Sequence, residues 1–423
     1  MLAVTAAGSA AAPDPTVTGW LADHARPLAV PDDLEPDPTG EGPGPDGVSA
    51  WVRAAAGARV VGLGPAVGGT RELAALVHRL VDGLVADGGV RTLALQVGES
   101  GATALDDHVR EGRGSAGSAL EGLGAWSWNN REMLDLVREL AEAAGAGTDP
   151  VRVVGVDPRR PATAVRVVGA FLRAAAPDLL PSVADALADL AQGHGDDATR
   201  VAVDRVVERL DRDVPALVAV TSPARHAEAV RHAGFLARAA ELAATPPARV
   251  DAVAARLMAD AVLDALDAAG PDERLVLWAH ADHVVVRDDP PTVGAHLRER
   301  LGDAYRALVL SAGSGTVRAV RRRRLVGAAR TPSTHRLHAP PASSLEAALL
   351  AACPRDSVLD LRALRDPDTP DAVTAWAGAG TSRRSVGDEV SPAAPAGGLV
   401  PCVPGAELDG FAVMRTVHPS RLR

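Results

Sequence analysis

Apolar runs and helix-spaced apolar positions alternate along the chain from about residue 50. The short apolar run Arg59–Leu63 is followed by helical spacing over Thr70–Asp87 and by a second apolar run, Thr92–Val97. A strand, a helix and another strand in this order are typical of a parallel sheet with helical crossovers. The alternation continues with a helical pattern at Asn130–Ala144 and an apolar run at Val151–Val156, which predicts an α/β fold.

The middle of the chain has a different pattern. From Ala162 to about Ala269 the apolar positions keep a helical spacing that is interrupted mainly by prolines, which predicts a helical insertion at about 162–269. Strand-like runs then resume, and we expect them to complete the same central, mostly parallel sheet, flanked by helices. These later runs are Arg274–Trp278, Ala307–Ser311, Val358–Leu361 and Gly410–Met414.

The first 49 residues are unlike the rest of the chain. Thr16–Val48 is rich in proline, glycine and aspartate and has few aromatic or branched apolar residues. Such a composition buries too little apolar surface to hold a fixed conformation. We therefore expect a mobile N-terminal segment at 1–49 and one α/β domain at 50–423.

Composition narrows the range of partners. The chain has 423 residues with 44 Lys plus Arg against 54 Asp plus Glu, a formal charge of −10. This charge disfavours nucleic acid and anionic membranes as partners, so a neutral or cationic small molecule fits better. The two cysteines are too few for a disulfide framework, and no uncharged apolar stretch approaches the roughly 18 residues of a membrane span. We expect a soluble, cytoplasmic protein.

A glycine-rich turn, Gly62–Thr70, links the first predicted strand to the first helix. Backbone N–H groups of such a turn can bind an anion at a helix N-terminus. The glycine spacing, however, is one residue longer than in a dinucleotide-binding turn, and Gln96 stands where a ribose-binding acid is expected. Nucleotide binding is therefore disfavoured.

A second candidate site is formed by His280, Asp282 and His283, directly after the apolar run that ends at Trp278. Ligands of α/β proteins bind at the carboxyl ends of parallel strands, so these side chains fit a pocket. Equally, one histidine could hydrogen-bond buried backbone while the other is exposed. A metal site would need a third ligand, for which Asp157 is the obvious candidate. We expect no metal and no other cofactor.

Motifs along most of the chain resemble the erythromycin esterase family in order and spacing. They extend over nearly everything after residue 50. The matching segments are Val60–Glu72, Leu93–Gln96, Leu105–Val109, Trp126–Glu132, Gly155–Asp157, Leu277–His283, Gly294–Gly302, Ser344–Glu346, Leu359–Arg362, Arg384–Gly387 and Asp409–Phe411.

The resemblance implies a metal-independent hydrolase that opens macrolide lactones with water activated by histidine and carboxylates. The family turn reads Gly-Glu-x-x-His-Gly-Thr, whereas this chain has Pro65 for the carboxylate and Gly68 for the histidine base. In addition, Val77 aligns with a family arginine and Gln96 with a family glutamate. General acid/base catalysis contributes roughly 10²–10⁴ in rate, so we expect no useful erythromycin esterase activity.

The residues that remain define the candidate site. His280 and His283 are the candidates for proton transfer, and Glu72 fits a helix-capping acid better than a catalytic group. The paired tryptophans of the matching motif either line an apolar wall of the pocket or pack in the core. The candidate substrate-binding residues are Gly68, Gly69, Thr70, Arg79, Gln96, Trp126, Trp128 and Asp157.

Three functions are compatible with this pattern. The first is a repurposed enzyme that uses His280 or His283 in the cyclisation, elimination or isomerisation of a small natural-product intermediate. The second is a non-catalytic pseudoenzyme that binds a hydrophobic, macrocyclic or polyketide-like ligand. The third is an ester hydrolase with relocated catalytic groups from His78, Arg79, Glu99 and His280.

Overall fold

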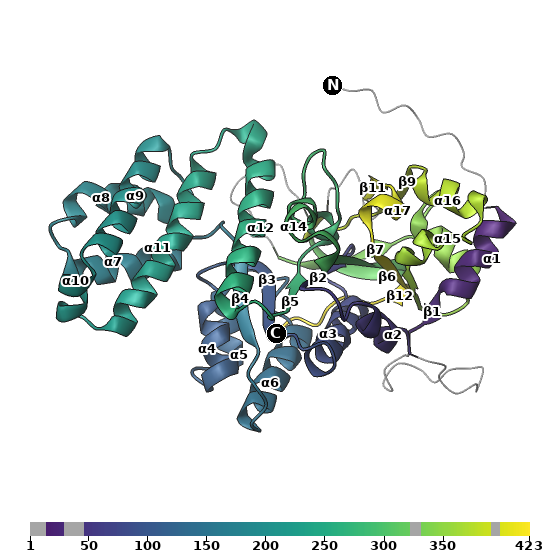
Figure 1. Cartoon of the computed structure of the whole chain (residues 1–423), viewed down its shortest axis with the longest axis horizontal. Coiled ribbons are helices and arrows are strands. Elements are labelled where there is room, and N and C mark those ends of the chain that lie inside the picture. The colour runs from purple at the N-terminus through teal and green to yellow at the C-terminus, as the bar shows by residue number, and fades with distance from the viewer. Residues whose placement is uncertain (1–13, 29–45, 322–330, 391–397) are drawn as a thin grey trace. The chain divides into compact units, whose positions relative to one another are not determined.

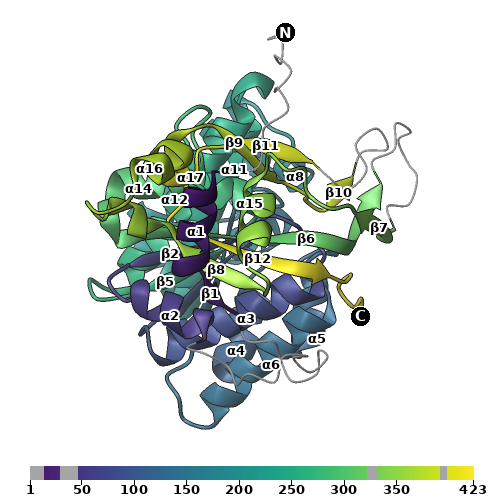
Figure 2. The ribbon, with the colours of Figure 1, turned by 90° about the vertical axis from the view of Figure 1, so that its right-hand side faces the viewer.

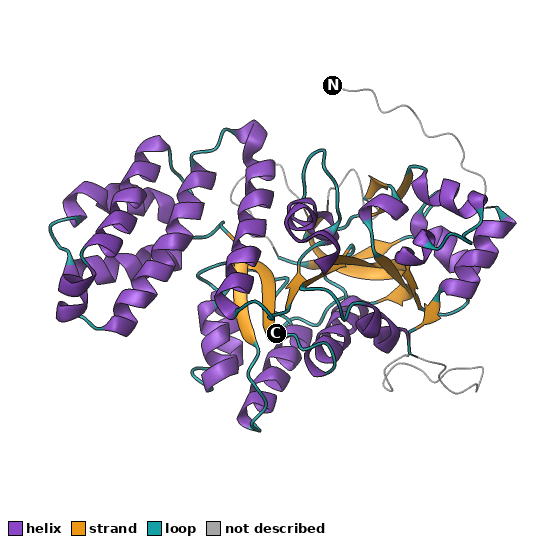
Figure 3. Cartoon of the chain, viewed as in Figure 1, coloured by secondary structure: helices purple, strands orange, loops and turns teal. Residues whose placement is uncertain are grey.

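The computed structural model describes residues 14–28, 46–321, 331–390 and 398–423, and Figures 1 and 3 show its helices and strands. These residues form two compact units, each assembled from separate segments of the chain. Unit 1 comprises 1–91, 126–139 and 272–423, and unit 2 comprises 92–125 and 140–271. Unit 2 contains strands as well as helices of the segment 162–269, for which a helical insertion is expected.

Unit 1 is built around a mostly parallel sheet with the strand order β1-β8-β12-β6-β2-β5. The four strands from β12 to β5 run parallel, while β8 is antiparallel to β12. All residues of β2 except the last are buried, which explains its uninterrupted apolar sequence. The bounds are β1 Arg26–Pro27, β8 Ser357–Asp360, β12 Gly410–Val417, β6 Tyr305–Arg321, β2 Val60–Pro65 and β5 Leu275–Trp278.

Shorter strands extend this arrangement. Strand β7 (Ser333–Leu337) pairs with β6 in the antiparallel direction, and β10 (Glu389–Val390) pairs with β6 in the parallel direction. A separate two-stranded sheet joins β9 (Thr381–Arg384) to β11 (Leu399–Cys402). The predicted α/β class with a mostly parallel sheet is therefore confirmed.

Helices cover both faces of the sheet in unit 1 (Figure 2). One face carries α2 and α3, and the other carries α13, α14 and α15, with α16, α17 and α1 packed beside them. The bounds are α1 Pro15–His24, α2 Gly47–Ala54, α3 Arg71–Ala86, α13 Ala281–Val284, α14 Val293–Leu301, η2 Gly302–Ala304, α15 Leu345–Ala352, η3 Leu361–Arg365, α16 Asp371–Gly378 and α17 Pro404–Glu407.

Helix α1 lies within the segment 1–49, for which mobility is predicted. Val17, Trp20 and Leu21 lie on one face of this helix and are buried. The side chain of Asp14 caps the helix by accepting a hydrogen bond from the backbone N–H of Thr16. Three apolar residues at helical spacing and one cap are enough to anchor a segment whose composition alone suggests disorder. The rest of the prediction, at 1–13 and 29–45, lies outside the described residues.

Unit 2 combines a parallel pair of strands with helices. The helices α7 to α11 enclose an apolar core of their own, while α12 packs against both strands. The bounds are β3 Thr92–Gly98, α4 Thr103–Glu111, α5 Ala116–Gly122, β4 Arg152–Asp157, α7 Ala162–Ala175, α8 Leu180–Ala191, α9 Asp197–Arg212, α10 Val214–Val220, α11 Pro223–Ala243, η1 Pro247–Arg249 and α12 Val250–Ala269. One further helix, α6 (Arg131–Gly145), begins in unit 1 and belongs to it as far as Glu139.

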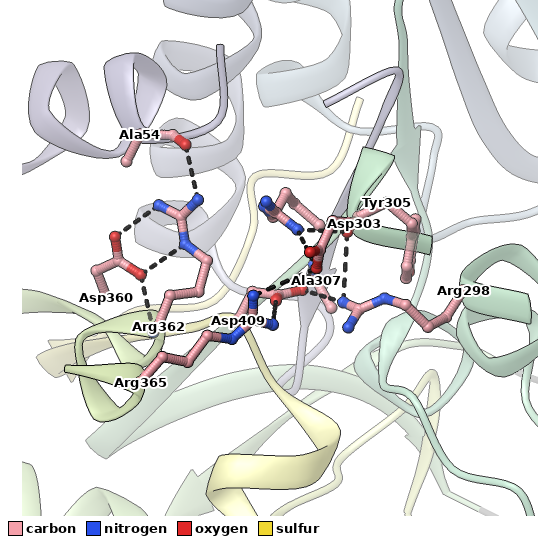
Figure 4. A network of polar contacts seen from close by, with 10 residues as sticks. Ala54, Arg298, Asp303, Tyr305, Ala307, Asp360, Arg362, Arg365 and Asp409 are labelled. Carbon is pink, nitrogen blue, oxygen red and sulfur yellow. Dashed lines mark hydrogen bonds and ion pairs between the residues drawn. The ribbon is translucent and has the colours of Figure 1, made fainter. Parts of the chain in front are cut away.

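A charged network lies at the amino end of the parallel strands in unit 1 (Figure 4). Asp409 directly precedes β12, and its Oδ2 accepts hydrogen bonds from Arg298 Nη2 at 2.5 Å and from the backbone N–H of Ala307 at 2.8 Å. Its other oxygen lies 4.0 Å from Arg365. The motifs Gly294–Gly302 and Asp409–Phe411, far apart in the sequence, therefore meet here to hold strands together.

A second ion pair lies at this amino end of the parallel strands (Figure 4). Arg362 donates to both carboxylate oxygens of Asp360, at 2.9 and 2.6 Å, and to the carbonyl oxygen of Ala54 at 2.9 Å. Its guanidinium lies over the ring of Trp51. Arg362 thus ties α2 to the end of β8, which gives the Leu359–Arg362 motif a structural role.

No helix within the described residues is long and apolar enough to cross a membrane.

Candidate functional site

The glycine-rich turn after β2 is bound to a neighbouring segment of unit 1. Ala66 donates its N–H to the carbonyl oxygen of Leu310 at 2.7 Å, and Gly68 donates to Val386 at 2.7 Å. In return, Val386 donates to Ala66 at 2.8 Å. These N–H groups, which could have bound an anion, are therefore already used within the protein.

Gly68 stands where the resemblance places the family's histidine base. A Cβ atom at this position would lie 3.4 Å from the carbonyl oxygen of Val386 and 3.5 Å from Asp388 Oδ1. A methyl group fits at these distances, but a longer side chain would point into the segment 386–388. Segment 386–388 therefore covers the place of the lost base.

Gly69 and Thr70 serve the geometry of the turn. Gly69 has a φ of 62°, and a Cβ atom there would lie 2.0 Å from the carbonyl oxygen of Arg318. Only glycine meets both conditions. The hydroxyl of Thr70 donates to the carbonyl oxygen of Val67 at 3.2 Å, just before α3 begins.

Glu72, in the first turn of α3, fastens the C-terminal segment of the chain. Its carboxylate accepts hydrogen bonds from the backbone N–H of His418 at 2.6 Å and makes a 2.8 Å contact with that residue's ring Nδ1. The side chain is only 3% exposed. Glu72 is thus a structural residue, although it anchors residue 418 rather than capping its own helix.

His280 follows β5 and caps the short helix α13. Its Nδ1 accepts a hydrogen bond from the backbone N–H of Asp282 at 3.3 Å, and its side chain is 21% exposed. Burial lowers the pKa of His280 below its usual value; the Asp282 carboxylate opposes this effect, and the Arg383 charge adds to it. The imidazole is therefore neutral near pH 7, with its proton on Nε2.

Asp282 connects His280 to the segment after β9. Its Oδ1 lies 2.7 Å from Arg383 Nη2, and its Oδ2 accepts a 2.6 Å hydrogen bond from the Ser385 hydroxyl and lies 3.5 Å from His280 Nδ1. Burial alone would raise the pKa of Asp282, but His280, Arg383 and Ser385 together hold that pKa below its usual value. We refer to His280, Asp282, Arg383, Ser385 and Asp388 as the His280 cluster.

The tryptophan motif lies against this cluster. The hydroxyl of Ser127 donates to Asp388 Oδ2 at 2.6 Å, and Trp128 contacts Trp278 edge to face with ring centroids 5.1 Å apart. Trp278 ends the strand that leads to His280. Trp126 is half-buried, and its carbonyl oxygen accepts the N–H of Asn129. Trp128 therefore packs beside the His280 cluster.

His283 lies in the same short helix as His280. Its N–H donates to the carbonyl oxygen of His280 at 2.9 Å, and its side chain is half-buried. The structure thus keeps both candidate proton-transfer residues on α13 or at its start.

Two other predicted residues, His78 and Arg79, lie further along α3, and each pairs with a carboxylate from another part of the chain. Arg79 Nη2 lies 3.1 Å from Asp46 Oδ2, and His78 Nε2 lies 2.6 Å from Glu139 Oε2. His78 follows Arg71 by seven residues and Arg79 by eight, which places them about 10–12 Å along the helix axis from its start. Within unit 1, the structure does not bring Arg79 to the glycine-rich turn.

Gln96 and Asp157 belong to unit 2. Gln96 is half-buried on β3, and Asp157, at the end of β4, accepts a hydrogen bond from the backbone N–H of Arg159 at 2.9 Å. Close by, Glu99 is 5% exposed and contacts Arg238 at 2.6 and 2.8 Å. Burial raises the pKa of Glu99 to about 7, against the opposing effect of Arg238. Asp157, Glu99 and Arg238 thus form a polar group within unit 2.

Sequence reasoning missed four polar members of the site in unit 1. They are Ser127, Arg383, Ser385 and Asp388. Arg383 and Ser385 contact Asp282, Asp388 acts on His280, and Ser127 joins the group through Asp388, all only through tertiary structure. The one available signal was that the segments Trp126–Glu132 and Arg384–Gly387 match family motifs. No spacing rule could have joined Asp282 to residues a hundred positions later.

The fold and the His280 cluster define an α/β protein with polar groups at the carboxyl end of parallel strands. The chain belongs to the erythromycin esterase family, since the family model described as erythromycin esterase matches residues 85–417. This match begins after the glycine-rich turn. No curated protein sequence matches the chain.

Solved structures show the same fold at low sequence identity. A Bacillus cereus protein is 20% identical with a TM-score of 0.77, covering 97% of this chain and 100% of its own. A succinoglycan biosynthesis protein is 16% identical with a TM-score of 0.76, covering 96% of this chain and 98% of its own. A mutant erythromycin esterase, EreC, in its open conformation is 16% identical with a TM-score of 0.64, covering 88% and 93%.

Proposed function

We propose that this member of the erythromycin esterase family acts on a small natural-product intermediate by proton transfer at His280. The reaction is a cyclisation, elimination or isomerisation rather than the hydrolysis of a macrolide. The observation that carries this proposal is the neutral, oriented imidazole of His280, held by Asp282 next to a turn that lacks the family's base.

The chemistry of His280 suits a reaction without activated water. Because Nδ1 accepts from the Asp282 N–H, the neutral imidazole carries its proton on Nε2, and a histidine in this form can polarise or protonate a carbonyl oxygen. Pro65 and Gly68 cannot orient or deprotonate a water molecule. His283, on the same short helix, is the second titratable side chain that the proposal places in the reaction.

The proposed ligand is a macrocyclic or polyketide-like small molecule and not a nucleic acid or a membrane. The net charge of −10 and the tryptophans beside the His280 cluster support an uncharged or cationic, largely apolar substrate. Both cysteines are free thiols, which supports a cytoplasmic location.

Incubation with a defined panel tests the proposal. The panel contains fourteen-membered macrolides, p-nitrophenyl esters and thioesters of polyketide chains, with products followed by mass spectrometry. We expect one panel member to be converted without a change in mass or with loss of water. His280→Ala should lower that rate by roughly 10²–10⁴, because it removes the proton donor.

The matched control is His194→Ala, which removes an exposed histidine from unit 2 and should leave the rate unchanged. A macrolide that gains the mass of one water at a rate comparable to the family's hydrolases would overturn the proposal. Turnover that survives His280→Ala would equally overturn it.

A second candidate function is non-catalytic ligand binding. It is favoured by the way the polar groups pair with one another: Asp282 with Arg383 and Ser385, and Asp388 with Ser127. A ligand that raises the melting temperature of wild type and His280→Ala alike, without being converted, would favour this pseudoenzyme over the enzyme.

A further inference from the structure

A histidine and two carboxylates meet on the outer side of unit 1, where α3 lies against α6. His78 and Asp82 are four residues apart on α3, so they share one face of that helix. Glu139 reaches the same place from α6. One nitrogen and two carboxylate oxygens of these residues all lie within 4.8 Å of one another.

The distances suit ligands that surround one small cation. His78 Nε2 lies 3.6 Å from Asp82 Oδ2 and 2.6 Å from Glu139 Oε2. Zinc binds nitrogen and oxygen ligands at about 2.0–2.2 Å, which places tetrahedral ligands roughly 3.3–3.6 Å apart. The first pair already has this spacing. The second needs Glu139 to withdraw slightly, which its 62% exposed side chain allows.

The charges of His78, Asp82 and Glu139 favour a bound cation between them. Two carboxylates flank a single imidazole, and the cation of the neighbouring Arg79 is directed to Asp46. The carboxylates of Asp82 and Glu139 lie close together, and their negative charges repel each other. A divalent ion bound between the three side chains would remove this repulsion.

We propose that His78, Asp82 and Glu139 bind one zinc ion, which joins α3 to the first half of α6. Mixed imidazole and carboxylate ligands suit zinc, whereas calcium and magnesium prefer oxygen ligands alone and in larger number. Water completes the tetrahedron. The glycine-rich turn lies about 10 Å along α3 from His78, so this ion takes no part in the proposed reaction.

Zinc titration of the full-length protein tests the site. The protein is stripped with EDTA, and zinc chloride binding is measured by calorimetry and by metal analysis after dialysis. We expect His78→Ala, Asp82→Asn and Glu139→Gln each to lose one equivalent of zinc, or to bind it roughly tenfold or more weakly. Cobalt should give the absorption bands of tetrahedral coordination in wild type and should lose them in the three ligand variants.

Asp87→Asn is the matched control, because it removes one exposed carboxylate just after α3 ends. It should keep the zinc affinity and stoichiometry of wild type. Equal zinc binding by wild type and the three ligand variants would overturn the proposal. So would the absence of any zinc binding by the stripped wild type.

Discussion

The two ends of the parallel strands in unit 1 differ in how far their polar residues match the family's motifs. At the amino end, Asp409, Arg298 and Arg362 match family motifs and form a dense set of hydrogen bonds and ion pairs. At the carboxyl end, Pro65 and Gly68 stand where the resemblance to the family places the groups that activate water. The difference teaches that the charges which hold this fold together are separate from the charges which run the family's chemistry.

The largest expected effect is at the amino end. Asp409→Asn removes a buried carboxylate and leaves the charge of the largely buried Arg298 side chain unpaired. We therefore expect a loss of about 3 kcal/mol in the free energy of unfolding. Urea denaturation measures it. The control is Asp303→Asn, whose carboxylate is 71% exposed, so solvent screens its ion pairs and the loss of stability should be much smaller than for Asp409→Asn. Equal losses would contradict the structural role of Asp409.

The carboxyl end can be probed by two neighbouring glycines. Gly69→Ala combines a positive φ with a Cβ atom 2.0 Å from a carbonyl oxygen, so we expect a loss of about 2–3 kcal/mol in stability. Gly68→Ala meets ordinary contacts and should change stability by less than about 1 kcal/mol. Similar melting temperatures for the two variants would show that the turn is not held as described.

A smaller effect should appear in the pH dependence of stability. The pKa of His280 is lower in the folded chain than in the unfolded chain, so the unfolded state takes up a proton first as the pH falls. Stability from this residue is complete above about pH 6.5 and declines below it. Replacing His280 by Asn should remove that part of the decline, as measured by denaturation between pH 5 and pH 7.

The matched variant Asp282→Asn should lower the pKa of His280 further, because it removes the nearby negative charge and leaves Arg383 unopposed. Titration of the imidazole signals by NMR measures this shift. A rise of that pKa in Asp282→Asn would contradict the electrostatics of the cluster.

Much of the fold could be predicted from the sequence, because strands buried on both faces are continuous apolar runs. The runs Arg59–Leu63 and Gly410–Met414 correspond to β2 and β12. By contrast, α1 was hidden in a segment rich in proline and glycine, where only Val17, Trp20 and Leu21 signal a helix. Composition averages over a segment, whereas burial depends on a few well-spaced residues.

The candidate site was less predictable than the fold. His280 could be found because it directly follows an apolar strand. Arg383 and Ser385 could not, because they reach Asp282 only after the chain has folded. The sequence of the turn suggests N–H groups that could bind an anion, but in the folded chain the N–H of Gly68 donates to Val386.

The most direct test of the central claim is the hydrolysis of a fourteen-membered macrolide by the purified wild-type protein, followed by mass spectrometry. The account predicts that the lactone stays closed, with no more product than in a buffer blank, because Pro65 and Gly68 cannot activate water. Ring opening at a rate comparable to the family's hydrolases would contradict it.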